Sequence, residues 1–220
     1  MLSNKLLFVL GIVLFIVSFF VGAFLPSNYK NELYESFAEK TKSIINKNNT
    51  SLSDLIILPL KIFLNNFKVL LVIYALSVTI VGSWIFLMLQ GLLTGAIATA
   101  PLVDLEMIKN IKSYFPQCTI TQQDLIYIKA SLLIPHGIFE ISGIVLGLIA
   151  SYHISTIMID ILRRKIFKKV EITIDAKAKI LNSLKFVLFS VALLLFAAFI
   201  EVFITPIVGG VVIYILCLSK

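Results

Sequence analysis

Charged residues are scarce in this sequence of 220 residues. Only 14% are Asp, Glu, Lys or Arg, whereas 59% are hydrophobic and the mean hydropathy is +1.02. Soluble domains carry about 25% charged residues and about 45–50% apolar ones. The shortage of charge therefore excludes an ordinary soluble enzyme and a disordered chain, and it indicates a polytopic membrane protein.

Familiar catalytic and metal-binding motifs are missing as well. The sequence has no H-E-x-x-H pair, no P-loop and no nucleophile elbow, since Gly82-Ser83 is followed by Trp84. Its two cysteines, Cys118 and Cys217, lack the spacing of a metal site, and we expect them at opposite depths without a disulfide. These absences argue against an enzyme and predict no cofactor and no metal.

Four long stretches of the chain are almost free of charge. They are residues 8–25, 69–103, 125–159 and 186–219. A membrane span needs about 20 apolar residues, so the first stretch fits one span, which we prefer to a cleaved signal because no A-x-A site follows it. We expect a turn near residues 81–83, a kink or break at Pro135 and a break at Pro206. The prediction is a single all-α membrane domain, a helical bundle of about six segments.

The net charge of +7 gathers in one segment. Residues 160–185 hold eight Lys and Arg against three acids, whereas residues 30–66 carry +1 and residues 104–124 carry −1. Basic loops stay on the cytoplasmic side. We therefore predict a plasma membrane protein with 160–185 as a cytoplasmic loop and both termini cytoplasmic. We interpret the basic run as a topology signal and expect the lipid bilayer, not nucleic acid, around this protein.

Residues 26–66 are predicted to form an amphipathic or interfacial segment on the outer side. Leu33, Phe37 and Ile44 recur at roughly helical spacing among charged residues. Residues 53–64 are too apolar to lie in water, and we expect them in the interface before Asn65-Asn66 turn the chain into the second span. Two overlapping sequons start at Asn48 and Asn49, and their glycosylation is left open.

Three of the ionisable residues inside the predicted spans stand close to Pro135 or Pro206. His136 and Glu140 are four residues apart and share one helix face, and Glu201 precedes the second break at Thr205-Pro206. A charge at this depth costs about 2.5–3.5 kcal/mol or more, so each needs a reason. One reading is a proton or cation relay; the other, which we favour, is hydrogen bonding to backbone groups of neighbouring helices. The predicted polar core comprises His136, Gly137, Glu140, Glu201, Thr205 and Pro206.

Two G-x-x-x-G spacings occur in apolar stretches. Gly91 and Gly95 follow Gln90 in one, and Gly143 and Gly147 form the other. Small residues at this spacing allow two helix backbones to approach closely in a membrane. We therefore predict helix packing at these four glycines and no chemistry.

These motifs resemble those of a known family. The stretch HGIFEISGIVLGLIAS (136–151) looks like the signature of the stage II sporulation protein M family, and FIEVFITP (199–206) resembles its C-terminal motif. Asn65-Asn66 and Gln90 before Gly95 are also similar, although the family more often has Asn at the Gln90 position. The resemblance covers most of 63–206. It implies an integral membrane protein with several spans and no established catalytic activity.

We therefore expect a non-catalytic membrane scaffold or assembly subunit, with other membrane proteins or a second copy as partners. A transporter or channel subunit with a polar site at His136, Glu140 and Glu201 remains open, as does an intramembrane hydrolase. A water-reachable cavity at these residues would favour transport. Dry side chains with backbone partners would favour the scaffold, and the hydrolase would need a metal or a nucleophile within reach of His136.

Overall fold

The computed structural model describes residues 3–44, 52–166 and 176–218, where all regular structure is helical. The α-helices of these ranges are α1 (Asn4–Ala23), α2 (Ser27–Ile44), α3 (Leu52–Ala75), α4 (Ile80–Ala98), α5 (Pro101–Tyr114), α6 (Gln122–Ile166), α7 (Ala176–Phe199) and α8 (Thr205–Leu218). A 3-10 turn, η1 (Leu76–Val78), separates α3 from α4, and a π-helical turn, η2 (Ile200–Ile204), joins α7 to α8. The predicted all-α class is confirmed.

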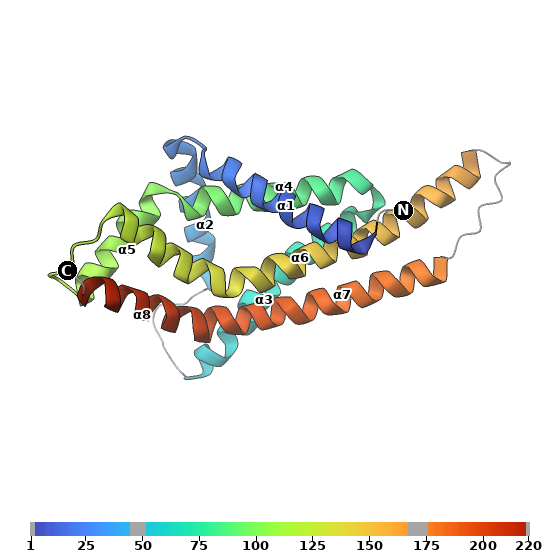
Figure 1. The fold of residues 1–220 in the computed structure, drawn as a ribbon. Coiled ribbons are helices and arrows are strands. Elements are labelled where there is room, and N and C mark those ends of the chain that lie inside the picture. Colours follow the sequence, from blue (N-terminus) through green and yellow to red (C-terminus); the bar gives the residue numbers. More distant parts are fainter. Residues whose placement is uncertain (1–2, 45–51, 167–175, 219–220) are drawn as a thin grey trace.

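Five helical stretches of the described residues are long and apolar enough to cross a membrane. They are Asn4–Ala23, Ile56–Val78, Val81–Ala98, Gln122–Arg163 and Ala176–Leu218. The sequence indicated about six, and the difference lies at the C-terminal end. There α7, η2 and α8 follow one another as a single long rod (Figure 1), so the chain does not turn back at Pro206.

Neither proline breaks its helix. Pro135 lies inside α6, which is 45 residues long in all. This helix changes direction along its length (Figure 1), as a proline inside a helix predicts. Pro206 follows the wider turn η2. Because proline clashes with the carbonyl four residues earlier, a π turn before it gives the ring room without ending the helix. The kink or break expected at Pro135 is therefore a bend within α6, and the break expected at Pro206 is a π turn.

The five spans meet in one apolar core. Its buried members include Phe15 of α1, Leu70 of α3, Leu87 of α4, Val145 of α6 and Leu194 of α7. Around this core α6 runs beside the α7–α8 rod, and α1 packs along α4 (Figure 1). The core therefore fixes the middle of the bundle, about halfway along each span.

Glycines bring α1 and α4 into backbone contact. A Cβ added at Gly91 would lie 2.6 Å from the Phe15 carbonyl oxygen, and one at Gly95 would overlap the Phe19 carbonyl. From the other side, a Cβ at Gly22 would overlap the Leu92 carbonyl. Helices associate in lipid through such close approach, because no hydrophobic force drives them together there.

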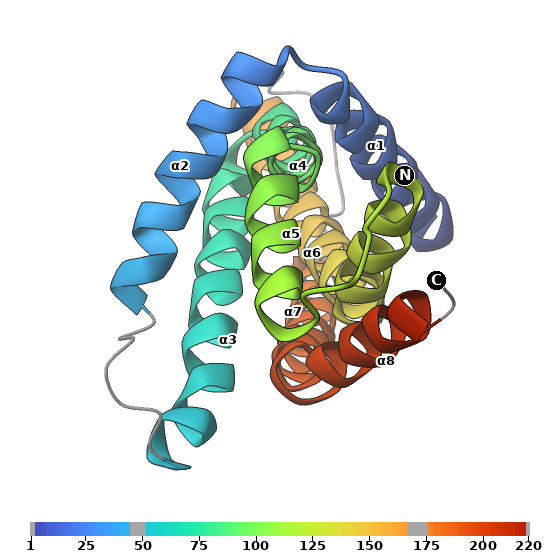
Figure 2. The same ribbon diagram turned by 90° about the vertical axis from the view of Figure 1, so that its left-hand side faces the viewer.

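Two amphipathic helices cover one end of the bundle, which we call the platform end. Figure 2 looks onto it and shows α2 and α5 lying side by side across the other helices. Tyr34 donates a 2.5 Å hydrogen bond to Glu106 Oε2, linking the two helices. Partial burial, together with this bond, raises the pKa of Tyr34 to about 12, so the phenol remains a donor into strongly alkaline solution.

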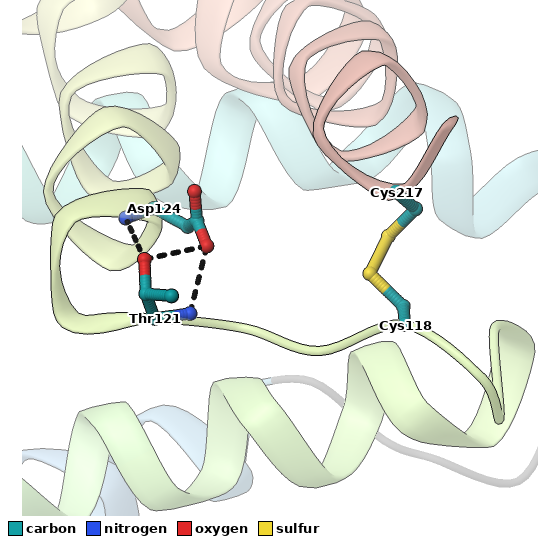
Figure 3. The surroundings of a disulfide bond; sticks show 4 residues. All are labelled: Cys118, Thr121, Asp124 and Cys217. Atoms are coloured by element: carbon teal, nitrogen blue, oxygen red, sulfur yellow. Dashed lines mark hydrogen bonds between the residues drawn. A yellow bond between two sulfur atoms is a disulfide. The ribbon is translucent and has the colours of Figure 1, made fainter. Parts of the chain in front are cut away.

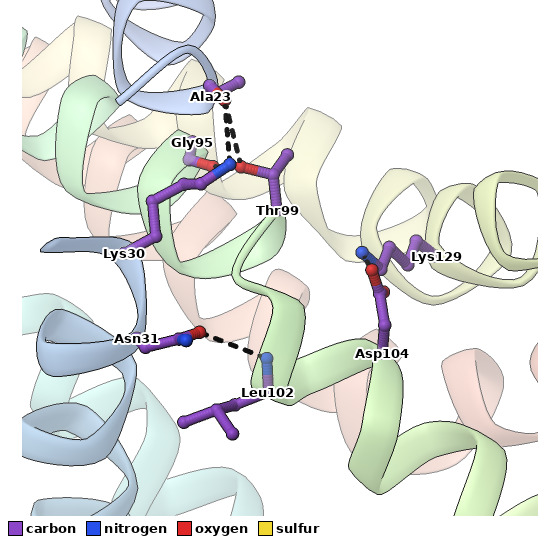
Figure 4. Close-up of polar contacts among 8 residues, drawn as sticks. All are labelled: Ala23, Lys30, Asn31, Gly95, Thr99, Leu102, Asp104 and Lys129. Atoms are coloured by element: carbon purple, nitrogen blue, oxygen red, sulfur yellow. Dashed lines mark hydrogen bonds and ion pairs between the residues drawn. The ribbon is translucent and has the colours of Figure 1, made fainter. Parts of the chain in front are cut away.

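Polar contacts fasten the platform to the spans (Figure 4). Lys30 donates to the Ala23 carbonyl at 3.2 Å, and Asn31 Oδ1 accepts from the Leu102 amide at 3.2 Å. Lys129 of α6 pairs with Asp104 of α5. The residues between the third and fourth spans are thus partly helical, and Pro101 begins α5 at a position where its missing N–H costs nothing.

A disulfide joins the platform end to the end of α8. Cys118, in the loop between α5 and α6, is bonded to Cys217, with Cα atoms 5.2 Å apart (Figure 3). The expectation that these cysteines lie at opposite depths is wrong. It assumed that the last segment returns after Pro206, whereas the α7–α8 rod carries Cys217 onward to the platform end.

The termini also differ from the sequence prediction. The C-terminal end of α8 lies at the platform end, whereas α1 begins at the opposite end of the bundle (Figure 1). The expectation that both termini lie on one side of the membrane does not fit these positions at opposite ends of the bundle.

The predicted loops are shorter than expected. Residues 160–185 were expected to be a loop, yet α6 continues to Ile166 and α7 begins at Ala176. Asn65-Asn66 do not turn the chain, because both lie within α3, and the turn expected at 81–83 falls at residues 76–79, where the Thr79 hydroxyl caps α4. The sequons at Asn48 and Asn49 lie outside the described residues.

Gly95→Ala should destabilise the protein by about 1–3 kcal/mol, because the new methyl group meets backbone that cannot move aside alone. Gly137→Ala is the matched control, since nothing lies within 4 Å of its Cβ position, and alanine gains up to about 1 kcal/mol of helix propensity. Thermal unfolding in detergent measures both. Equal effects of the two changes would contradict the close α1–α4 packing.

Reporter fusions should place the two ends of the α7–α8 rod on opposite sides of the membrane. Alkaline phosphatase, which folds only outside the cytoplasm, should be active at the C-terminus and inactive when inserted within residues 167–175. Green fluorescent protein should give the reverse pattern. The same activity at both positions would refute a continuous rod through Pro206.

Candidate functional site

The predicted polar residues gather where α6 meets the π turn. His136 Nδ1 lies 3.3 Å from the Thr205 hydroxyl, which joins α6 to the first residue of α8. Thr205 is only 6% exposed. Because this contact spans the join between η2 and α8, it holds the C-terminal part of the rod against α6.

The two acids lie together one helical turn further along. Glu140 and Glu201 are close enough to interact electrostatically, and both are half-buried. The helices are antiparallel, so His136 faces Thr205 and Glu140 faces Glu201, with a spacing of four residues on each helix. Neither carboxylate forms a hydrogen bond or ion pair with another residue of the described ranges, so the backbone partners that we expected for the two acids are not found there.

Two of the predicted members add little to this arrangement. Gly137 has no atom within 4 Å of its Cβ position, so it does not serve close packing. Pro206 is exposed, and its contribution is to the π turn. Within the described residues, no three His, Cys, Asp or Glu side chains are arranged to hold a metal ion.

The glycines of α6 pack as their spacing suggested. A Cβ on Gly143 would lie 3.1 Å from Leu194 of α7 and 3.2 Å from the Ser190 carbonyl. On Gly147 it would overlap the Leu70 side chain of α3. The motif that contains His136 and Glu140 is therefore continuous with a stripe that packs α6 against two other spans.

Sequence reasoning missed a set of buried serines between the spans. Ser190 Oγ donates to the Gly143 carbonyl at 2.6 Å, and Ser155 Oγ to the Ser77 carbonyl at 2.6 Å. Ser83 and Ser151 share a 2.6 Å hydrogen bond between α4 and α6. These bonds satisfy polar groups inside the bundle, where lipid offers none.

A signal for these serines exists in the sequence. Ser151 and Ser155 stand four residues apart in an apolar helix, a small-residue spacing that marks interhelical contact as glycine does. Three more small residues, Gly11, Ser18 and Gly22, lie on the buried face of α1 together with Leu7 and Phe15. A search for glycine pairs four residues apart does not find this stripe, because serine takes the place of one glycine.

Lys68 was also missed. It is exposed and lies inside the span Ile56–Val78, although the second charge-free stretch of the sequence begins only at residue 69. Leu70, two residues later, belongs to the central core. Both signs of charge are therefore present on the membrane-spanning part of the bundle, Lys68 on α3 and the carboxylate pair on α6 and η2.

Thr205→Val should lower the free energy of unfolding by about 0.6–2 kcal/mol, because it removes the hydroxyl that contacts His136 and keeps the side chain's shape. Thr94→Val is the control, since the Thr94 hydroxyl bonds only to the Gln90 carbonyl of its own helix. Thermal unfolding in one detergent compares them. If Thr94→Val lowered the melting temperature as much as Thr205→Val, the contact between α6 and α8 would stabilise the fold no more than a hydrogen bond within one helix.

Comparison with known proteins agrees with this architecture. The family model of stage II sporulation protein M matches residues 11–206, which begin inside the first span and end at Pro206 in the fifth. An uncharacterised protein of the archaeon Methanocaldococcus jannaschii is 34% identical over 131 residues, which cover 56% of this chain and 65% of the relative. The match thus spans just under two thirds of that relative's length.

No solved structure matches this chain. The family match extends over most of the sequence and includes every residue of the polar cluster formed by His136, Glu140, Glu201 and Thr205. The chain is a membrane protein that belongs to the stage II sporulation protein M family.

Proposed function

We propose that this protein is a non-catalytic scaffold or assembly subunit of a membrane complex. The observation that carries the proposal is the contrast between two kinds of polar group. Inside the bundle, serine hydroxyls are paired with carbonyls of neighbouring helices, as Ser190 is with Gly143. At the flank, Glu140 and Glu201 lie half-buried beside each other, and Lys68 is exposed within its span.

Ionisable side chains on a span that have no hydrogen bond or ion pair within the described part of the chain favour a partner on another chain. A charged side chain in the hydrocarbon costs about 2.5–3.5 kcal/mol or more, and a charge of opposite sign on a neighbouring helix offsets that cost. A partner helix that carries Lys or Arg would satisfy Glu140 and Glu201. A second copy of this chain would offer Lys68 to the same pair, so either kind of partner fits the charges.

The rigidity of the bundle supports a scaffold further. Gly95 and Gly143 hold helices at backbone contact, and a disulfide between Cys118 and Cys217 ties the rod to the platform end. A scaffold benefits from such fixed geometry, since a preformed surface loses little freedom on binding.

We infer that the end of the bundle at which α6 ends and α7 begins, which we call the arm end, faces the cytoplasm of the plasma membrane. The surplus of eight bases over three acids in residues 160–185 supports this orientation. The disulfide at the platform end supports it too, because disulfides persist in oxidising compartments outside the cytoplasm. The N-terminus would then be cytoplasmic and the C-terminus outside.

A transporter is the second candidate, favoured by the adjacency of Glu140 and Glu201 at a π turn. Acids within spans form proton relays in pumps, and π turns often mark functional sites. In proteoliposomes, a transporter would give proton or cation flux that falls in Glu140→Gln and Glu201→Gln. A scaffold predicts flux equal to that of empty liposomes.

A photocrosslinker at Phe203 tests the scaffold directly. Phe203 is 44% exposed and lies two residues from Glu201, whereas Leu188, 61% exposed on α7, is the control site away from the acids. Crosslinking in the native membrane should give a discrete protein adduct at 203 and mainly lipid adducts at 188. The adduct at 203 should disappear in Glu140→Gln/Glu201→Gln. Lipid adducts alone at both sites would contradict the proposal.

A charge swap separates a second copy from a different partner. If the partner is a second copy, Lys68→Glu should abolish the adduct at 203, and Lys68→Glu combined with Glu201→Lys should restore it. If Lys68→Glu leaves the adduct unchanged, the cation comes from another membrane protein. Thermal unfolding of each variant confirms that the fold is retained.

A further inference from the structure

Helices α6 and α7 project beyond the rest of the bundle at the arm end. His153 Nε2 lies 3.1 Å from Asn4 in the first turn of α1, and Ser155 bonds to Ser77 in the turn between α3 and α4. The ends of α1, α3 and α4 therefore lie level with residues 153–155. Beyond that level α6 continues to Ile166, about three helical turns or roughly 16 Å.

Figure 1 shows the projecting pair at the end of the molecule that carries the N label. We call residues 156–166 of α6 and 176–182 of α7 the arm. Asp160 of α6 and Lys179 of α7 join its two helices by an ion pair of 2.6 Å. The arm is thus a braced extension of two helices.

Each helix of the arm carries an exposed apolar stripe that ends in a base. On α6 the stripe is formed by Met158, Ile161 and Leu162, and Lys165 follows at the same helical spacing. On α7, read toward the tip, Leu184 just below the arm and Leu181 and Ile180 within it precede Lys177. The α7 stripe continues the exposed face of the span.

Charge at the tip of the arm is of one sign among the described residues. Arg163, Lys165 and Lys177 are exposed and have no ion pair within the described part of the chain, whereas the acid Asp160 is held by Lys179. Apolar side chains that reach the membrane surface and then give way to bases fit an interface with acyl chains on one side and anionic groups on the other.

We propose that the arm binds the headgroups of anionic phospholipids through Arg163, Lys165 and Lys177. The apolar stripes lie against the outermost acyl carbons, and the three bases meet the phosphate layer just beyond the ends of α1, α3 and α4. A second copy does not fit this surface, because two basic arms repel each other. An acidic protein segment would match the charge but would not account for stripes that continue a lipid-facing span.

Lipid-dependent stability tests the proposal. Purified protein in detergent is titrated with phosphatidylglycerol or with phosphatidylcholine, and unfolding is followed through Trp84, the sole tryptophan. Phosphatidylglycerol should raise the melting temperature, whereas phosphatidylcholine and inorganic phosphate should not. Arg163→Gln/Lys165→Gln/Lys177→Gln should need more phosphatidylglycerol for the same shift, about fivefold for each base removed.

Two further variants make the result specific. Lys109→Gln/Lys112→Gln removes exposed bases at the platform end and should respond to lipid as the parent does. Arg163→Lys/Lys165→Arg/Lys177→Arg keeps the charge and should also respond normally. If the triple Gln variant unfolds, Lys177→Gln alone replaces it, and this variant should need about fivefold more phosphatidylglycerol for the same shift of the melting temperature. An equal response to both lipids, an unchanged response of the Gln variants, or stabilisation by polyglutamate in place of phosphatidylglycerol would overturn the proposal.

Discussion

Close backbone approach between helices is the constraint on which this structure depends. In lipid no hydrophobic force draws apolar helices together, so contact distance and internal hydrogen bonds decide which helices pair. Gly95 lets α4 reach the Phe19 carbonyl of α1, and Gly143 lets α6 reach Ser190 of α7. The core around Val145 and the polar cluster beside it exist because these two seams are tight.

The polar cluster follows from the same seam. Once α6 and the rod lie in antiparallel contact, residues four apart on each helix face one another, so His136 meets Thr205 and Glu140 meets Glu201. The π turn before Pro206 lets the rod continue to the platform end, so that α8 stays in contact with α6 beyond the polar cluster. The carboxyl groups of Glu140 and Glu201, unlike the serines inside, have no hydrogen-bond or ion-pair partner among the described residues, which is the basis of the proposed scaffold.

Sequence reasoning gave the fold class, the family and the main seams, because these rest on local patterns. Long apolar stretches mark spans, and glycines four residues apart mark close contact whichever helix is the partner. Sequence reasoning failed where the position of the following helix depends on the direction that the chain takes after a proline. Whether Pro206 reverses the chain or is absorbed by a π turn depends on packing against α6, and the disulfide of Cys118 with Cys217 and the position of the C-terminus follow from that one choice. Lys68 was missed for a related reason, since the span boundary within α3 is set by the core around Leu70.

The contact between α6 and η2 at Glu140 and Glu201 is called the carboxylate seam here. Hydrogen–deuterium exchange on the protein in lipid nanodiscs tests most directly whether this seam is a fixed structural feature. The peptides to compare cover residues 136–143 and 199–206 at the seam and residues 11–22 at the α1–α4 contact. A scaffold with a dry, rigid seam predicts exchange at the seam as slow as at residues 11–22. Fast exchange at 199–206 while 11–22 stays protected would show water entering beside Glu140 and Glu201, and it would contradict the scaffold in favour of transport.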